Sequence, residues 1–384
     1  MLLAEQIAST AAMQAVFSAR ATAQAMLDVE AGLAVAGAAV GLVPPEAVAA
    51  IKAACNAEAI DTSKLATDGA LAGTVVIPLV TWLKAALPEH AKYAHIAGTS
   101  QDIIDTGLVL QLRAGIALLQ ADLATMADAA AKLAATHAKT AMLGRTLMQA
   151  AMPTTFGLKA ANWLVAIDES RCAIARGAGE ALVLQCGGAA GTLDVIQTDP
   201  VKFLDAFGAA LNLRVGPTPW HTSRAPLARL AAAIAAAVGL AGKIGTDIAL
   251  MMQSEIAEVR EPAAPGRGGS SAMAHKRNPT LSIAARAAAV RMPGFVATLL
   301  AAADQEHERA AGAWQAEAAT WPALMLCASG GIAAMAEALA GLELFPAAMA
   351  KNLALLPAQQ LPPAIDAFIQ RALNSHQNIG NELG

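Results

Sequence analysis

The chain has 384 residues, enough for a large hydrophobic core and for two or three domains. Its formal net charge is −4, so it offers no basic surface of the kind that binds nucleic acid. Only 15% of the residues are charged while 56% are apolar, and alanine, a strong helix former, dominates the apolar set. We therefore predict a buried helical bundle whose surface is covered further by association of several copies.

A mean hydropathy of +0.48 makes a membrane span the first alternative to consider. The longest uncharged run covers 19 residues, 318–336, which just reaches the length needed to cross a bilayer. It contains Thr320 and a Gly330-Gly331 pair and is rich in alanine rather than leucine, so a core helix fits it better. Glu5 interrupts any secretory signal at the N-terminus. We expect a cytoplasmic protein without a membrane segment.

The four cysteines lie far apart in the sequence: Cys55, Cys172, Cys186 and Cys327. They show none of the short spacings typical of a metal site. We expect buried thiols in a reducing compartment and no bound metal.

The first 95 residues predict several short helices, because prolines interrupt the apolar pattern. At Thr99 the pattern changes, since Thr99-Ser100-Gln101-Asp102 resembles a capping box and opens an apolar periodicity that continues to about residue 136. Four more long helical patterns follow, at about 154–180, 226–259, 279–305 and 313–340. No strand-like alternation longer than a few residues appears.

Beyond Gly341 the sequence is short and broken by prolines, which predicts a small C-terminal cap. The whole pattern predicts an all-α fold built around a long-helix bundle. We expect an N-terminal helical domain of residues 1–95, a central long-helix bundle domain of residues 96–340 and a short C-terminal segment of residues 341–384.

Polar side chains gather where the first long helix is expected to begin. Thr99 and Ser100 would place hydroxyl groups at a helix N-terminus, whose free N–H groups favour an anion. Gln101 and His95 lie next to them. Plain helix capping also explains the hydroxyls, and His95 alone is compatible with an ordinary structural histidine.

A second polar group follows Gly144 and offers three hydrogen-bond donors for a carboxylate: Arg145, Thr146 and Gln149. A turn that leads into a helix is the alternative explanation. His221, beside Trp220, and Arg309, at the end of a later helix, are further candidates for binding an anion, although a solvated charged turn would also explain Arg309.

The segment 268–279 is the densest in chemical groups, with glycines, two hydroxyls, two adjacent cations and an amide. A Gly-rich loop can close over an anionic ligand and bring a hydroxyl to a carbon atom. Serine is a poor base, so Ser270 needs donors such as Lys276 and Asn278 around it to stabilise an alkoxide-like state. Ser271 is the alternative reacting hydroxyl, Met273 completes the loop, and a flexible basic linker remains the other explanation.

These segments resemble, in order, the signature regions of the fumarase/aspartase/argininosuccinate lyase superfamily. Residues 269–279 match the pattern G-S-S-x-M-P-x-K-x-N-P except at Ala274, where proline is usual. Residues 95–106 resemble the first region in its T-S-Q-D form, and residues 144–157 resemble the second. The resemblance covers most of residues 1–340. It implies a long-helix bundle with a shortened C-terminal cap, assembled as a homotetramer whose active sites combine regions from different subunits.

One position separates the branches of that superfamily. Elimination enzymes such as adenylosuccinate lyase carry a histidine acid directly after the threonine of the second region, and here that position is Leu147. An enzyme that expels an amine would lose its acid, whereas an internal lactonisation has no leaving group to protonate. Residues 185–193 and 219–222 also resemble the cycloisomerases that lactonise 3-carboxy-cis,cis-muconate in the protocatechuate branch of aromatic catabolism.

The resemblance implies an isomerase that uses no cofactor and acts on a small tricarboxylate. Its expected catalytic residues are Ser270, Lys276 and His95. Its expected substrate-binding residues are Thr99, Ser100, Gln101, Arg145, Thr146, Gln149, His221, Ser271, Met273, Asn278 and Arg309. An adenylosuccinate-lyase-like elimination enzyme and a catalytically silent helical scaffold of the same fold are the alternatives.

Overall fold

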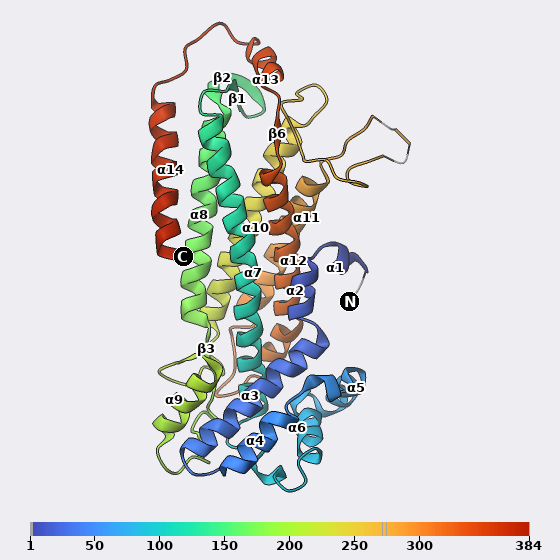
Figure 1. Ribbon diagram of the computed structural model, residues 1–384, viewed down its shortest axis with the longest axis vertical. Coiled ribbons are helices and arrows are strands. Elements are labelled where there is room, and N and C mark those ends of the chain that lie inside the picture. The colour runs from blue at the N-terminus through green and yellow to red at the C-terminus, as the bar shows by residue number, and fades with distance from the viewer. Residues whose placement is uncertain (1–2, 271, 274, 384) are drawn as a thin grey trace.

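The computed structural model describes residues 3–270, 272–273 and 275–383 and shows an elongated molecule built around five long helices (Figure 1). These are α7 (Ser100–Thr136), α8 (Phe156–Ala181), α10 (Ala225–Met251), α11 (Thr280–Ala301) and α12 (Ala313–Ala340). α7 packs against α8 and α12, and α10 packs against α8, α11 and α12. The predicted all-α long-helix bundle is confirmed.

Shorter helices cover one end of this bundle, where α3 (Ala19–Ala39) packs on α7 and on α9 (Pro200–Leu211). The other elements that precede α7 are α1 (Leu3–Ile7), α2 (Ala11–Val16), α4 (Pro45–Ala54), α5 (Thr62–Ala72), α6 (Val76–Ala85) and the 3₁₀ turns η1 (Ala57–Ala59) and η2 (Ala91–Tyr93). The predicted division at residues 95 and 340 stays a prediction, because one hydrophobic core joins residues from Met13 to Ala372.

The segment after Gly341 contains more helix than its prolines suggested. α13 (Pro346–Leu353) lies at the upper end in Figure 1, and α14 (Ala364–Leu383) then returns along α8. Three apolar side chains at helical spacing bury one face of α14: Ile365, Ile369 and Ala372. Polar residues make up much of the rest of α14, so the sequence analysis did not recognise this helix of 20 residues.

Six short strands form three two-stranded sheets in the described residues. β1 (Ala141–Thr146) and β2 (Gln149–Thr155) make an antiparallel hairpin, which the sequence analysis did not predict because neither strand alternates in hydrophobicity. β3 (Val183–Leu184) pairs in parallel with β4 (Arg214–Val215). β5 (Val259–Arg260) pairs antiparallel with β6 (Glu343–Leu344). The helix expected to continue to residue 259 ends at Met251 instead, and Ala257 at φ 49° turns the chain into β5.

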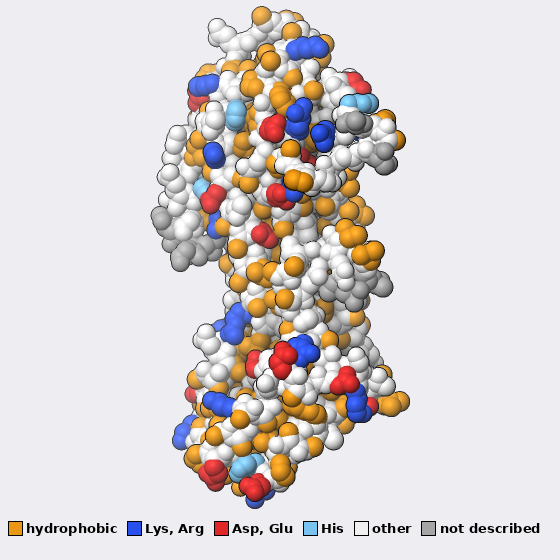
Figure 2. Space-filling view, turned by 45° about the vertical axis from the view of Figure 1, so that its right-hand side comes forward, with side chains coloured by type: hydrophobic (Ala, Val, Ile, Leu, Met, Phe, Trp, Pro, Cys, Tyr) orange, Lys and Arg blue, Asp and Glu red, His pale blue; other side chains and the backbone are white. Residues whose placement is uncertain are grey.

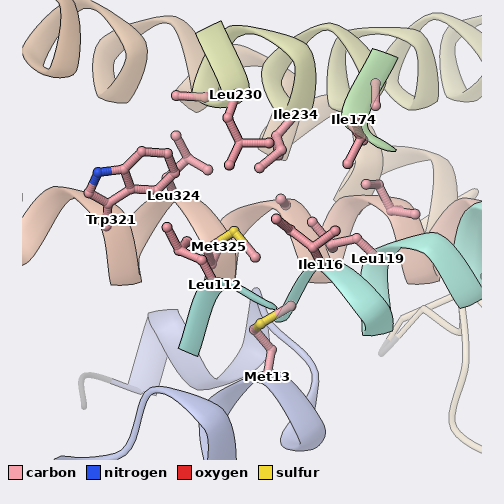
Figure 3. Packing of buried hydrophobic residues seen from close by; sticks show 14 of the residues in the cluster. Met13, Leu112, Ile116, Leu119, Ile174, Leu230, Ile234, Trp321, Leu324 and Met325 are labelled. Atoms are coloured by element: carbon pink, nitrogen blue, oxygen red, sulfur yellow. The ribbon is translucent and has the colours of Figure 1, made fainter. Parts of the chain in front are cut away.

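The core follows the bundle axis, where apolar side chains of α7, α8, α10 and α12 meet (Figure 3). The side chains labelled there from these helices are all at most 6% exposed: Leu112, Ile116, Leu119, Ile174, Leu230, Ile234, Trp321, Leu324 and Met325. Each large apolar side chain buried in this way contributes about 1.5–3 kcal/mol. The layer fixes the long helices relative to one another and so sets the distance between the two ends of the molecule.

The surface is poor in charge. Charged side chains are sparse on the middle of the face in Figure 2 and gather toward its two ends. By length and composition alone, α10, α11 and α12 could each cross a membrane. Within the chain, 56%, 22% and 72% of their most apolar windows are buried, respectively, so α11 is the one that leaves most of its apolar surface uncovered.

A close backbone contact between α7 and α8 gives a test of this packing. A Cβ on Gly157 would lie 2.5 Å from the Cα of Ala138 and 2.8 Å from the carbonyl oxygen of Ala134. Because backbone atoms cannot move aside, we expect Gly157→Ala to lower the free energy of unfolding by about 1–3 kcal/mol in a denaturant titration. Gly179→Ala on the same helix meets nothing within 4 Å and should not destabilise. Equal stability of the two variants would contradict this packing.

Candidate active site

The predicted site residues lie in two groups at opposite ends of the bundle. One group surrounds the N-terminus of α7: His95, Thr99, Ser100, Gln101, His221 and Arg309. The other lies on the β1–β2 hairpin and in the loop between β5 and α11: Arg145, Thr146, Gln149, Ser270, Met273, Lys276 and Asn278. Ser271 lies outside the described residues. The 37 residues of α7 put about 55 Å between the two ends, so no small molecule can touch both groups of one chain.

Asp102 organises the first group from a fully buried position. Its carboxylate accepts hydrogen bonds from five donors: Thr99 N (3.1 Å), Gln185 Nε2 (3.0 Å), Gly187 N (3.1 Å), Gly188 N (2.9 Å) and His221 Nε2 (2.7 Å). The bond to Thr99 confirms the predicted reach of Asp102 back to the helix cap. His221 is only 4% exposed, so in this structure it holds the loop onto α7 rather than facing an open cavity.

Arg309 reaches the same helix end from the segment between α11 and α12. Its Nε donates to Gln101 Oε1 at 2.7 Å and its Nη1 donates to the Thr99 hydroxyl at 3.0 Å. A guanidinium beside the N-terminus of a long helix makes a site that favours an anion. Gln101 is fully buried, and its Nε2 donates to Asp105 Oδ2 (3.1 Å) and to the His221 carbonyl oxygen (2.8 Å). These two bonds fix the Gln101 side chain and so hold the oxygen that accepts from Arg309 in place.

A buried ion network that the sequence analysis missed lies one turn further along α7. Arg224 donates to both oxygens of Asp105 (2.7 and 3.0 Å) and to both oxygens of Glu317 (2.9 and 2.6 Å). Burial alone would lower the pKa of Arg224, but the two carboxylates outweigh it and raise that pKa. Burial raises the pKa of Glu317. The sequence signal was the spacing of Gln101 and Asp105, two polar residues one turn apart on the same face of α7.

The second group begins with Arg145, which is engaged within the chain. Its two terminal nitrogens donate to the Glu258 carboxylate at 3.0 and 2.9 Å. The Glu258 side chain is fully buried and also accepts from Asn352 Nδ2 at 2.9 Å. This bidentate pair links the hairpin to the residue just before strand β5, a structural role that the sequence could not reveal.

The tip of that hairpin is strained and apolar. Leu147 and Met148 form its two-residue turn with φ 50° and 67°, a conformation that usually requires Asn-Gly. They are 95% and 69% exposed, and Thr146 and Gln149 beside them are exposed too. Strain of this kind persists where the surroundings or the function demand it. The tip therefore exposes two polar donors and two apolar side chains on the surface of this chain.

The loop between β5 and α11 is closed at its base. The carbonyl oxygen of Gly268, at φ 67°, accepts from the Asn278 N–H at 2.8 Å, and a Cβ on Gly268 would lie 2.7 Å from the Asn278 carbonyl oxygen. The Ser270 hydroxyl oxygen accepts from the backbone N–H groups of Ala272 (3.3 Å) and Met273 (3.2 Å). Two donors aimed at one oxygen stabilise negative charge on it, which is what an alkoxide-like serine needs.

This loop borders a cavity of about 920 Å³. Arg260, Lys276 and Arg277 line it together with His275, and no carboxylate is among the described residues of its wall. Arg260 Nη1 also lies 3.9 Å from Glu343 Oε2. Cations around a cavity whose described wall carries no carboxylate attract a multiply charged anion. No group of three or more His, Cys, Asp or Glu side chains in the described ranges could hold a metal ion, and the expected lack of a cofactor stays a prediction.

Because Arg145 pairs with a buried carboxylate, its replacement should destabilise the chain even without substrate. We expect Arg145→Ala to lower the free energy of unfolding by about 3 kcal/mol, since Glu258 is left buried with less compensation. The exposed Gln149→Ala on the same hairpin should change it by less than about 0.5 kcal/mol. Unchanged stability of Arg145→Ala in thermal and denaturant unfolding would instead assign Arg145 to ligand binding alone.

Comparison with known proteins agrees with this geometry. A family model described as Lyase matches residues 6–294. The chain is 45% identical to the 3-carboxy-cis,cis-muconate cycloisomerase of Bradyrhizobium diazoefficiens, over 90% of this chain and 77% of that protein. It is 43% identical to the enzyme of the same name from Pseudomonas putida, over 94% of this chain and 87% of that protein.

The solved structures include a 3-carboxy-cis,cis-muconate lactonizing enzyme from Pseudomonas putida, which superposes with a TM-score of 0.92 at 35% identity and covers 98% of this chain and 99% of that one. The family match, the two relatives and this superposition agree with the long-helix bundle. The chain therefore belongs to this lyase family, the fumarase/aspartase superfamily.

Proposed function

We propose that this chain is a 3-carboxy-cis,cis-muconate cycloisomerase, which converts the muconate to a carboxymuconolactone in the protocatechuate branch (the β-ketoadipate pathway) of aromatic catabolism. The observation that carries the proposal is the cation-lined cavity bordered by Met273, Lys276 and Asn278 of the Ser270 loop, whose described wall contains no carboxylate and so suits a tricarboxylate. The names of the relatives at 43–45% identity support the same substrate.

The reaction needs one bond and one proton. A carboxylate oxygen of the substrate forms a C–O bond to a carbon of the conjugated double bond, and the displaced π electrons move toward a neighbouring carboxylate. The enediolate-like charge that develops there is neutralised when the adjacent carbon takes up one proton from the enzyme, which regains it from water. Lys276 and Asn278 in the loop, with Thr146 and Gln149 from the hairpin, are the donors proposed to stabilise that charge.

Ser270 is the proposed donor of that proton. The N–H groups of Ala272 and Met273 lie 3.3 and 3.2 Å from its oxygen, so the serine can release its hydrogen while these donors stabilise the charge left behind. In the lactone-opening direction the same oxygen would act as the base.

The hairpin tip supports lactonisation over elimination. An elimination that expels an amine needs an acid near the leaving group, and the exposed tip offers Leu147 and Met148 instead. Both are apolar and carry no proton to give. An internal addition has no leaving group, so an apolar wall can exclude water without slowing the chemistry.

Active sites of this kind would have to be shared between copies. Thr99, Ser100 and Arg309 lie about 55 Å along α7 from the Ser270 loop, so the two half-sites can meet only between chains. We propose a homotetramer. The exposed side of α11 supports it, since Ile283, Val290 and Leu300 are 51%, 82% and 56% exposed there.

The uncovered face of α11 suits protein better than lipid. Arg286 and Arg291 are exposed on this helix together with the apolar side chains. A guanidinium facing hydrocarbon costs at least about 2.5 kcal/mol, whereas at a protein interface it can find a partner. The four cysteines are all free thiols, which agrees with the proposed cytoplasmic location.

Replacement of the proposed proton donor tests the reaction directly. We expect Ser270→Ala to lower kcat about 10²- to 10⁴-fold with little change in KM, because proton transfer and not binding is lost. Turnover is followed as loss of the ultraviolet absorbance of the conjugated muconate. Ser63→Ala, an exposed serine on α5, should behave as the unaltered protein. If Ser270→Ala kept most of its turnover, the assignment of Ser270 as the proton donor would be wrong.

Complementation between two inactive variants tests the sharing of sites. Arg309→Ala removes a group at one end of the bundle and Ser270→Ala removes a group at the other. In mixed assemblies some sites combine an intact Ser270 loop from one variant with an intact Arg309 group from the other. Activity should therefore return when the two variants are co-expressed. A mixture of Ser270→Ala with Lys276→Ala, altered in the same loop, should stay inactive. Recovery in neither mixture would argue against shared sites.

A further inference from the structure

The buried carboxylate of Glu30 touches the candidate catalytic histidine. Glu30 lies on α3, and its side chain is fully buried within the apolar face that includes Leu27 and Leu33. Its Oε1 is 2.6 Å from His95 Nδ1. Its Oε2 is buried and has no hydrogen-bond partner among the residues that the structure describes. Among those residues, His95 is therefore the only hydrogen-bond partner of the Glu30 side chain.

The surroundings of Glu30 are apolar and carry negative charge. Burial, and after it the charges of Glu30 and Asp28, raise the pKa of the neighbouring Cys55 thiol to about 12, so this thiol stays protonated and neutral. A carboxylate in such a place is costly unless a donor compensates it. The compensating donor here is the imidazole ring of His95. The buried carboxylate of Glu30 therefore needs the ring as its donor, and the ring is held in place by the carboxylate.

The backbone around His95 adopts an unusual conformation that places the imidazole ring next to Glu30. His95 and Ala97 adopt φ 60° and 59°, in the left-handed region that ordinary residues rarely enter. The strained turn lies just before α7, between η2 and Thr99. Strain held in place beside a helix end that favours anions is typical of a segment whose shape serves a ligand.

Three histidines in the described part of the chain pair with carboxylates, and only His95 leaves a ring nitrogen available at the candidate site. His221, paired with Asp102, is 4% exposed and enclosed. His376 lies between Asp168 and Asp128 on the side of the bundle, where α14 meets α8. His95 is 20% exposed, and its Nε2 makes no hydrogen bond to a described residue.

We propose that Glu30 is a positioning residue that fixes His95 with Nδ1–H toward α3 and Nε2 toward the anion site at the N-terminus of α7. A carboxylate only accepts hydrogen bonds, so contact with Oε1 places the hydrogen on Nδ1 and sets both the tautomer and the ring orientation. Nε2 is then the nitrogen that meets the substrate. The effect of Glu30 on catalysis rests on the proposed cycloisomerase function, whereas its effect on the tautomer of His95 does not depend on that function.

A double-mutant cycle separates positioning from a structural role. Glu30→Gln should lower kcat about 10- to 100-fold with little change in KM, as expected when the partner of a functional histidine is lost. In a His95→Ala background the same substitution should change kcat by less than about 2-fold, because its effect passes through the ring. Asp168→Asn breaks the matched pair with His376 and should leave kcat unchanged.

The tautomer is read independently by ¹⁵N NMR of the unaltered protein with labelled histidine. We expect neutral His95 to carry its hydrogen on Nδ1 and to lose this preference in Glu30→Gln, with folding checked by circular dichroism. A hydrogen on Nε2 in the unaltered protein, or equal losses of kcat in both backgrounds, would overturn the proposal. If the protein does not consume the muconate at all, the proposed function fails, and the NMR result alone decides the role of Glu30.

Discussion

The length and rigidity of α7 constrain everything else in this molecule. Its 37 residues form one continuous helix, and the apolar layer of α8, α10 and α12 holds it in place. One group of candidate site residues surrounds its first turn, and the other lies on the hairpin and loop near its last turn, about 55 Å away. Under the proposed function, a single copy therefore holds two separate half-sites. The strained apolar hairpin tip and the bare face of α11 are the surfaces expected of a chain that completes its sites with other copies.

Charge is scarce in this chain, and the structure uses most of its buried charge in closed pairs. Arg224 is enclosed by Asp105 and Glu317, and Arg145 is matched by Glu258. These networks fix the loops at both ends of the bundle onto the helices. Arg260, Lys276 and Arg277 line the cavity next to the Ser270 loop, and of these Arg260 pairs with Glu343 at 3.9 Å. The described wall of the cavity holds no carboxylate, which favours binding of a multiply charged substrate there.

The sequence predicted the helices best where a local signal marked their ends. Thr99 and Asp102 mark the start of α7, and α12 begins and ends where the periodicity placed it. The β1–β2 hairpin was not predicted because polar and apolar residues do not alternate along its strands. Helix α14 was not predicted because much of its surface is polar. Candidate site residues were recognised as motifs, but their hydrogen-bond partners were not. Glu30 and Glu258 are separated from His95 and Arg145 by 65 and 113 residues, and no local pattern reports such contacts.

The most direct measurement is the distance between the two half-sites across chains. One population carries a spin label at Leu147→Cys on the hairpin tip, and the other carries one at Lys92→Cys beside the start of α7, both with the partly exposed Cys172 replaced by alanine. After the populations are mixed and allowed to assemble, pulsed dipolar spectroscopy reports only distances between chains. The account predicts a population well below the ~55 Å that α7 imposes within one chain. Absence of dipolar coupling between chains, or a monomeric molar mass, would contradict it.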